Sequence, residues 1–256
     1  MFVKLVSGDA NPESPEIHRQ EAKILSELPP DAPVAHLLEV YDDGNWVGLV
    51  LEDVPGRQPR LPWQAHELNR VLDALDELAA RMTPSPVAVP AFADDPLGGG
   101  EGFALLDKIG FGQRLDPWVE RHLDRLVHLE SALADSHGET LAHGDVRADN
   151  VLLTDDRVVF VDWPWASRGA EWLDLVLFLP SVAMQGGPAP WEVFGSRRHA
   201  RPARAEAVTA VVAILAGFLV SRSLEAAPPG LPTLRPFQAA QATHAVAWLR
   251  ERTGWV

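Results

Sequence analysis

Three oxygen-bearing side chains stand close together near the middle of the 256-residue chain: Asp145, Asn150 and Asp162. Asp145 belongs to a His-Gly-Asp turn, Asn150 follows five positions later, and Asp162 ends an apolar run seventeen positions after Asp145. Between Asn150 and Asp162 lie two short apolar runs around a polar turn, a pattern that predicts a largely buried β-hairpin. Because Asn150 enters this hairpin and Asp162 leaves it, we expect their side chains to lie side by side.

These residue types suit one kind of chemistry. An amide oxygen and a carboxylate at neighbouring strand ends form a hard-oxygen site for Mg²⁺, which keeps further positions for water and phosphate oxygens. Asp145 stays free on the preceding loop, where it can orient an attacking hydroxyl or accept its proton. Metal ligands and a positioning base are what phosphoryl transfer requires. The structural alternative makes the His-Gly-Asp segment a loop turn and Asp162 a cap.

The order H-G-D-x-x-x-x-N, followed by an apolar run and Asp162, resembles the catalytic and metal loops of the aminoglycoside phosphotransferase and choline kinase group. That group is a small-molecule branch of the protein-kinase-like fold, whose own catalytic loop reads H-R-D-x-x-x-x-N. The resemblance implies that Asp145 is the catalytic base, that Asn150 and Asp162 hold Mg²⁺, and that ATP is the co-substrate. It runs from Lys4 to about Phe178 and fades beyond.

Lys4 and Glu21 are the nucleotide-binding pair that the resemblance implies. The chain contains only three lysines, and Lys4 lies within an apolar strand predicted over 2–6. In kinase-like folds such a lysine holds the α- and β-phosphates, and a glutamate of the following helix aligns it. Glu16 and Glu27 compete with Glu21 for this role. The plainer alternative is a surface lysine with a solvated helix glutamate.

Five further positions receive roles from the resemblance alone. The Glu52 carbonyl and the Val54 amide are expected to face the adenine ring of the nucleotide. Asp174 is expected to hydrogen-bond the backbone of the catalytic loop, with His143 as a second structural support. Arg147, two positions after Asp145, is expected to stabilise charge on the transferring phosphoryl group.

The fold implied by the resemblance is α+β and protein-kinase-like, with two lobes. We expect residues 1–54 to form a small β-rich N-lobe and residues 55–256 a large, mainly helical C-lobe, with apolar patterns that predict helices over 64–82, 116–133, 203–227 and 234–248. Kinase-like folds place a Gly-rich hairpin before the lysine strand, but only three residues precede Lys4. Either the given sequence begins late or the hairpin has been lost, and on either alternative we expect the N-lobe of this sequence to be truncated. No strand-lysine pattern follows the glycine cluster at 98–102, which we interpret as a loop.

Composition limits the classes of protein that fit. With 46% hydrophobic and 23% charged residues the chain has the composition of a globular protein. It contains no cysteine, which excludes disulfides, thiolate metal sites and cysteine nucleophiles. The longest apolar run, 207–220, is too short to span a bilayer and predicts a buried helix. The N-terminus carries no signal-peptide pattern, so we expect a cytoplasmic enzyme without a membrane partner.

Charge points to the kind of partner. A net charge of −14 disfavours nucleic acid, whose binding depends on Lys and Arg, and favours a small cationic acceptor. The alternative is that the acidity only supports solubility. Trp163, Trp165 and Trp172 are expected to be core residues, unless one of them holds a cationic substrate against its ring.

The leading hypothesis is an ATP-dependent small-molecule kinase that moves the γ-phosphate to a hydroxyl of a small, cationic molecule. The alternative is a catalytically impaired pseudokinase that binds nucleotide without turnover. The missing hairpin motivates this alternative, and the intact catalytic motif disfavours it. A protein kinase is disfavoured by Gly144, where those enzymes carry arginine, and by Trp163 directly after Asp162.

Overall fold

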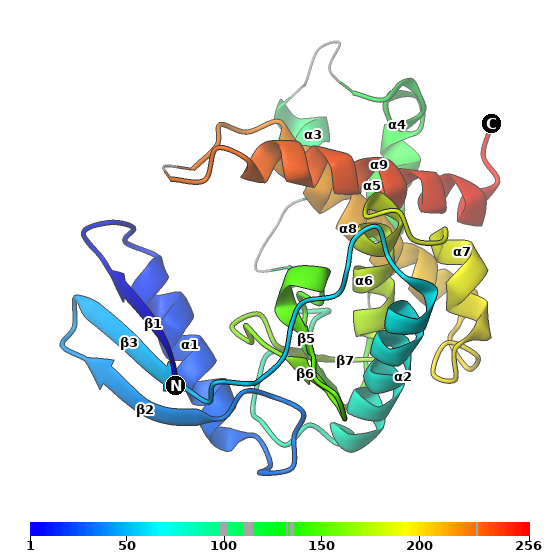
Figure 1. The fold of residues 1–256 in the computed structure, drawn as a ribbon. Helices are drawn as coiled ribbons and strands as arrows, with labels where there is room; N and C mark the ends of the chain where they lie inside the picture. The colour runs from blue at the N-terminus through cyan, green and yellow to red at the C-terminus, as the bar shows by residue number, and fades with distance from the viewer. Residues whose placement is uncertain (98–101, 110–114, 132, 134–135, 229) are drawn as a thin grey trace.

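The computed structural model describes residues 1–97, 102–109, 115–131, 133, 136–228 and 230–256. Of the glycine cluster interpreted as a loop, residues 98–101 lie outside these ranges. Figure 1 shows a small part built on one sheet beside a larger part that is mostly helical. This arrangement agrees with the α+β prediction.

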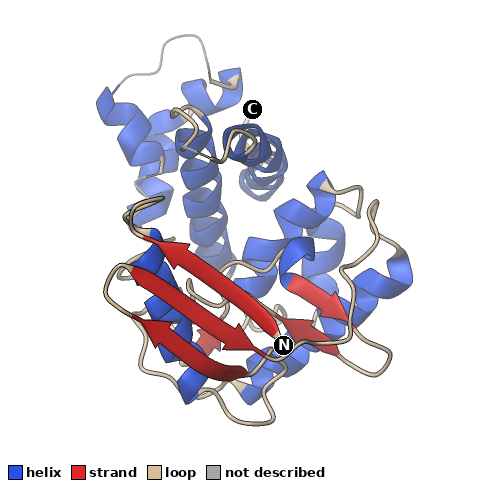
Figure 2. Ribbon diagram, turned by 60° about the vertical axis from the view of Figure 1, so that its left-hand side comes forward, coloured by secondary structure: helices blue, strands red, loops and turns tan. Residues whose placement is uncertain are grey.

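The small part is an antiparallel sheet in the order β1-β3-β2 with one helix against it, as Figure 2 shows. Its elements are β1 (Phe2–Ser7), α1 (Ser14–Glu27), β2 (Leu37–Asp42) and β3 (Trp46–Leu51). Leu49 of β3 and Ile24 of α1 are fully buried, so apolar burial fixes α1 on this face of the sheet. Lys4 stands directly opposite Leu49 in the strand register and therefore lies on the same face as α1.

The larger part carries two short antiparallel strand pairs among its helices. The pairs are β4 (Thr140–Ala142) with β7 (Ser167–Gly169), and β5 (Val151–Leu153) with β6 (Val158–Phe160). Its described helices are α2 (Ala65–Arg81), α3 (Phe103–Ile109), α4 (Pro117–Arg121), α5 (Leu123–Ser131), α6 (Leu173–Met184), α7 (Pro190–Val193), α8 (Ala205–Ser223) and α9 (Leu234–Thr253), together with short 3₁₀ turns at Ala148–Asn150 and Phe194–Ser196.

The single helix predicted over 116–133 is wrong, because α4 and α5 are separated at His122. This side chain is buried, and its ring lies 5.1 Å from the Trp118 ring and 5.4 Å from the Trp255 ring. Its Nε2 donates to the Val256 carbonyl at 3.2 Å. Docking of the C-terminal residues thus accompanies a non-helical backbone at His122, with φ −110° and ψ 14°. Apolar periodicity cannot reveal such a tertiary contact.

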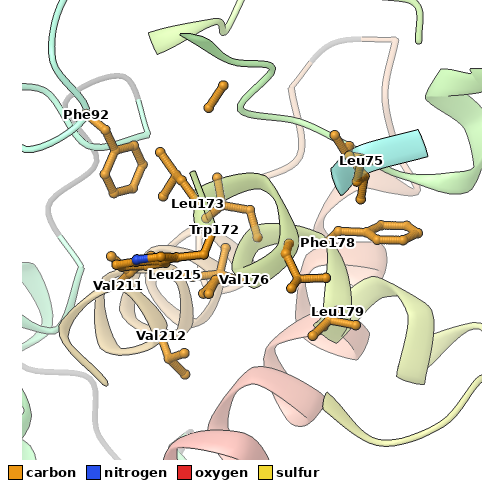
Figure 3. Packing of buried hydrophobic residues seen from close by; sticks show 14 of the residues in the cluster. Leu75, Phe92, Trp172, Leu173, Val176, Phe178, Leu179, Val211, Val212 and Leu215 are labelled. Carbon is orange, nitrogen blue, oxygen red and sulfur yellow. The ribbon is translucent and has the colours of Figure 1, made fainter. Parts of the chain in front are cut away.

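The core of the larger part is formed by α6 and α8. Figure 3 shows Trp172 and Val176 facing Val211 and Leu215 of α8. By length and composition α8 is the one helix in the described ranges that could cross a membrane, with a mean hydropathy of 1.7, but 67% of this stretch is buried within the protein. That burial is typical of a core helix. Since α6 is held in this core, its first-turn residue Asp174 has a fixed position.

Candidate active site

The catalytic loop follows β4 and is anchored by His143, which is fully buried. The His143 Nε2 donates to the Val161 carbonyl at 2.9 Å, and the Nδ1 accepts the Asp145 N–H at 3.2 Å. These two partners require opposite roles of the ring nitrogens, so they fix one tautomer of a neutral ring. The ring also packs against buried Trp163, at 4.6 Å between centroids. His143 therefore ties the loop to the strand end after β6, as its predicted supporting role requires.

Gly144 and Asp174 fix the turn itself. Gly144 has φ +82°, and a Cβ atom there would lie 2.3 Å from the Trp165 carbonyl oxygen. Glycine is required on both counts. The carboxylate of Asp174 accepts the N–H groups of His143 (2.8 Å) and Gly144 (2.9 Å). Burial raises the pKa of Asp174, and these hydrogen bonds oppose that rise. The predicted contact of Asp174 with the loop backbone is thus present.

Asp145 lies half-buried at the tip of the turn. Burial raises its pKa to about 6, and the nearby charge of Arg147 acts in the opposite direction. Both carboxylate oxygens accept from the Arg147 guanidinium, at 2.6 and 2.8 Å, and Asn150 Nδ2 lies 3.2 Å from Asp145 Oδ2. Burial lowers the pKa of Arg147, but its pairing with Asp149 and Asp145 outweighs burial. Arg147 therefore stays charged and holds the expected catalytic base directly.

The predicted hairpin is present as β5 and β6, and it places Asn150 beside Asp162. The Val161 N–H donates to the Asn150 carbonyl at 3.0 Å, so the two candidate metal ligands flank the same end of the strand pair. Asn150 uses its Nδ2 on Asp145, which leaves its side-chain oxygen for a ligand. Asp162 has φ +70°, an uncommon conformation for a residue other than glycine and one that occurs often at functional sites. Its side chain is 41% exposed.

One carboxylate and one amide do not form a complete metal cage. Within the described ranges, no group of three or more His, Cys, Asp or Glu side chains is arranged to hold a metal ion. Proteins often bind Mg²⁺ through one or two carboxylates, and phosphates of the substrate complete the coordination. Asn150 and Asp162 fit that mode of binding, in which the ion arrives with a nucleotide.

Lys4 joins the small sheet to this site. Its Nζ donates to both oxygens of Glu21, at 2.7 and 2.9 Å, and to Asp162 Oδ1 at 2.6 Å. Burial lowers the pKa of Lys4, but the two carboxylates raise it further and the net direction is upward. The expected pairing of Lys4 with Glu21 is present, whereas Glu16 pairs with Arg19 instead.

The segment after β3 leaves two backbone groups without partners. In the part of the chain that the structure describes, neither the Glu52 carbonyl nor the Val54 N–H has a hydrogen bond, although the Glu52 N–H donates to the His36 carbonyl. The Glu52 side chain is engaged with His36 and Arg157. An acceptor and a donor two residues apart are what an adenine edge needs. The geometry is compatible with the expected nucleotide contact.

A cavity of about 290 Å³ opens beside Asp145 on the helical side of the site. Besides the catalytic loop with Asp145 and Arg147, its wall is formed by four further segments, whose lining residues include Phe92, Asp95, Trp165, Ser167, Phe218 and Gln238. None of these was assigned to the site by a sequence motif, although Trp165 was one of the three tryptophans for which contact with a cationic substrate was the alternative. The lining residues come together only through tertiary packing.

The three tryptophans near the metal loop differ in burial. Trp163 is 0% exposed and Trp172 is 6% exposed, so both are core residues as predicted. Trp165 is 47% exposed and lines the cavity, which corrects its assignment to the core. The signal available in the sequence was its position three residues after Asp162, flanked by Pro164 and a small residue.

Several solved structures with the same fold are small-molecule kinases by their descriptions. A thermostable mutant of the aminoglycoside phosphotransferase APH(4)-Ia, in complex with AMP-PNP and hygromycin B, is 15% identical with a TM-score of 0.60, over 93% of this chain and 83% of that chain. The choline kinase LicA from Streptococcus pneumoniae is 14% identical with a TM-score of 0.59, over 97% and 85% of the two chains. An aminoglycoside phosphotransferase from Alicyclobacillus acidocaldarius is 17% identical with a TM-score of 0.56, over 98% and 85%.

These likenesses confirm the predicted kinase-like fold and, at such low identities, show no more than the fold. A comparison with curated proteins finds no match. The profile of the phosphotransferase enzyme family matches residues 1–210, which include the catalytic loop, the hairpin and Asp174. The resemblance inferred from the H-G-D-x-x-x-x-N motif is thereby confirmed, and the chain belongs to the phosphotransferase enzyme family.

Proposed function

We propose that this protein transfers the γ-phosphate of ATP to a hydroxyl group of a small molecule. The observation that carries the proposal is the convergence of groups from both parts of the chain: Lys4 contacts Asp162 at 2.6 Å, and Asn150 contacts Asp145 at 3.2 Å. The groups proposed to bind adenine, the phosphates and the metal would then lead in order to Asp145, the proposed general base for the acceptor hydroxyl. Related structures hold AMP-PNP with hygromycin B, and AMP-PNP with Ca²⁺ and an amicoumacin.

On the nucleotide side, residues 1–54 would form the lobe that holds ATP, with 55–256 as the catalytic lobe. The Glu52 carbonyl and the Val54 amide would pair with the adenine edge. Lys4, aligned by Glu21, would donate to the α- and β-phosphates. Its ammonium group could exchange its hydrogen bond to Asp162 for one to a phosphate oxygen.

At the reacting centre, Asp145 would accept the proton of the acceptor hydroxyl while that oxygen forms a bond to the γ-phosphorus. The bond from the γ-phosphorus to the bridging oxygen breaks, and ADP leaves with the electron pair. Arg147 lies within reach of the same point and would offset charge on the transferring group. Mg²⁺, held by Asn150 and Asp162, would neutralise phosphate charge.

The acceptor is expected to be cationic, because a net charge of −14 raises the local concentration of cations near the cleft. The alternative of a pseudokinase finds no support in the site. A pseudokinase has no need of the residues proposed as base, metal ligands and phosphate-binding lysine, and the chain retains Asp145, Asn150, Asp162 and the Lys4–Glu21 pair.

The experiment is a phosphate-transfer assay on the purified protein with ATP, Mg²⁺ and a panel of hydroxylated amines and sugars, read by mass spectrometry of the products. Asp145→Asn is the test variant. Asp149→Asn is the control, because Asp149 also pairs with Arg147 but is 54% exposed and outside the proposed chemistry. We expect transfer to fall by at least about 100-fold in the first and by little in the second. Parental turnover in Asp145→Asn would remove Asp145 from its role.

A further inference from the structure

Two cavities meet at Asp145, and together they describe the acceptor. The outer one has a volume of about 290 Å³ and the inner one about 100 Å³. Both are lined by Asp145, Arg147, Phe218 and Gln238, so they are two chambers of one space. The outer chamber alone is near the lower end of the roughly 300–1,000 Å³ that is usual for small-molecule sites. It is larger than a compact quaternary amine needs.

Charge is scarce in these chambers. Among the described lining residues the only carboxylates are Asp95 and Asp145, and the only cation is Arg147. Arg147 already pairs with both oxygens of Asp145. Asp95 is exposed and has no ion pair within the described ranges, so it is the one carboxylate free to meet a cationic group. A ligand with several ammonium groups would leave most of them desolvated without a partner, which is strongly unfavourable.

Apolar side chains make up most of the walls. Phe92, Trp165 and Phe218 face the outer chamber, and Leu215 and Phe237 line the inner one. Aromatic and aliphatic walls with few polar groups are typical of sites that bind a largely apolar ligand. An apolar body therefore matches the space better than a densely hydroxylated sugar.

Gln241 supplies the remaining polar contact. This α9 side chain lines the inner chamber and is only 6% exposed. Within the described part of the chain its amide has no hydrogen-bond partner, whereas the neighbouring Gln238 accepts from Arg235 at 2.9 Å. The Gln241 amide atoms are not among the buried polar atoms that lack a partner in the described chain, so they are open to the chamber, where a polar group of a bound molecule can replace water. Because Gln241 and Asp145 both line the inner chamber, an acceptor that reaches Asp145 can supply this hydrogen bond.

We propose that the acceptor is an amphipathic alcohol with an apolar body, one hydrogen-bonding group for Gln241 and no more than one cationic group, which faces Asp95. This inference rests on the proposed phosphotransferase function and makes its expected cationic acceptor more specific. It assigns Gln241 and Asp95 as residues that determine specificity. Neither a polycationic sugar nor a compact amine such as choline satisfies this space as well.

The test compares four hydroxylated probes: propranolol, which has a naphthyl body and one amine; naphthyl glyceryl ether, its uncharged counterpart; kanamycin, a polycation; and choline. Transfer from ATP and ligand-induced shifts in Tm are measured for each. We expect both naphthyl probes to raise Tm and to be phosphorylated with a higher kcat/KM than kanamycin or choline. A higher kcat/KM for kanamycin or choline, or no response to either naphthyl probe, overturns the inference.

Matched variants separate the contributions. Gln241→Leu should raise the KM of both naphthyl probes roughly 3- to 10-fold through the lost hydrogen bond, and Gln64→Leu, an exposed glutamine at the start of α2, is its control. Asp95→Asn should raise the KM of propranolol about 3-fold and leave that of the ether unchanged, because only propranolol carries a charge. Asp94→Asn, which changes the adjacent exposed carboxylate, is the control. Equal effects of Asp95→Asn on both probes would contradict the role of Asp95.

The two proposals fail in different ways. Phosphorylation of kanamycin alone keeps the phosphotransferase function and removes the inference about the acceptor. If the naphthyl probes raise Tm, Gln241→Leu abolishes this shift and no probe is phosphorylated, then the inference about the ligand of the cavity stands. The proposed phosphotransferase function is then refuted.

Discussion

Asp145→Asn should stabilise the protein while it abolishes transfer. Burial raises the pKa of Asp145 from 3.8 to about 6, and each pKa unit corresponds to about 1.4 kcal/mol. The native state therefore binds this proton more tightly than the unfolded state. The resulting contribution to the free energy of unfolding is fully present below about pH 4 and is lost as the pH rises through 6. Its full size is about 3 kcal/mol.

Asparagine resembles the protonated acid in shape and charge, so the variant keeps this contribution at every pH. Compared with the parent, its free energy of unfolding should be higher by up to about 3 kcal/mol near pH 8 and by about half of that near pH 5. For a chain of this size the gain near pH 8 corresponds to roughly 6–12 °C in Tm. The side chain is 26% exposed, so solvent screening leaves most of the effect.

The assay is urea unfolding followed by tryptophan fluorescence, with EDTA and without nucleotide, at the two pH values. Asp149→Asn is the matched control, since it removes the exposed partner of Arg147 and should change stability by less than about 1 kcal/mol at either pH. Equal or lower stability of Asp145→Asn at pH 8, or a gain that does not depend on pH, would refute the assignment of a buried, raised-pKa carboxylate at this position.

Three further variants test the surroundings of the site. Gly144→Ala should destabilise the protein by about 2 kcal/mol or more and remove transfer, because its Cβ would lie 2.3 Å from the Trp165 oxygen; Gly195→Ala, whose Cβ would meet nothing within 4 Å, is the control in thermal unfolding. Asp174→Asn should cost about 1–3 kcal/mol in urea unfolding and lower kcat, because the two loop N–H groups bond to different oxygens of Asp174 and asparagine replaces one of these with an NH₂ donor; an unchanged kcat would separate loop support from catalysis. Lys4→Met should weaken ATP binding in calorimetry and cost about 3 kcal/mol, because it leaves Glu21 charged and 2% exposed without a partner. Adding Glu21→Gln should restore stability but not ATP binding, and recovery of both would show that Lys4 does not touch the nucleotide.

The sequence predicted the local geometry of the candidate site, because the contacts that form it lie close together in the chain. A hairpin of twelve residues or fewer leaves little choice of pairing, so Asn150 and Asp162 had to meet once β5 and β6 formed. The H-G-D turn is likewise stabilised from within, because the Asp145 N–H donates to the His143 ring. The pairing of Lys4 with Glu21 spans 17 residues and was accessible only through the family resemblance.

Other features depend on contacts that no local pattern contains. The break at His122 follows from packing against Trp255, which lies more than a hundred residues away in the sequence. Arg147 was expected to face the phosphoryl group, and its direct contact with both oxygens of Asp145 could not be read from their spacing. Spacing predicts proximity, but it does not say which of several charged partners a side chain selects.

The residues that line the acceptor space are widely separated in the sequence. Phe92 precedes β4, Phe218 ends a face of α8 that apolar periodicity marks only as buried, and Gln241 belongs to α9, whose sequence contains no motif. Packing of α8 against α9 and α6 brings Phe218 and Gln241 to Asp145, whereas Phe92 is held where its N–H donates to the Arg168 carbonyl of β7. The candidate groups for metal binding and proton transfer therefore lie in one stretch from Asp145 to Asp162, whereas the walls of the acceptor space come from segments that meet only in the folded state. Under the proposed roles, two chains with identical catalytic motifs can differ in acceptor, and Gln241→Leu should change acceptor preference without altering a residue assigned to phosphate transfer.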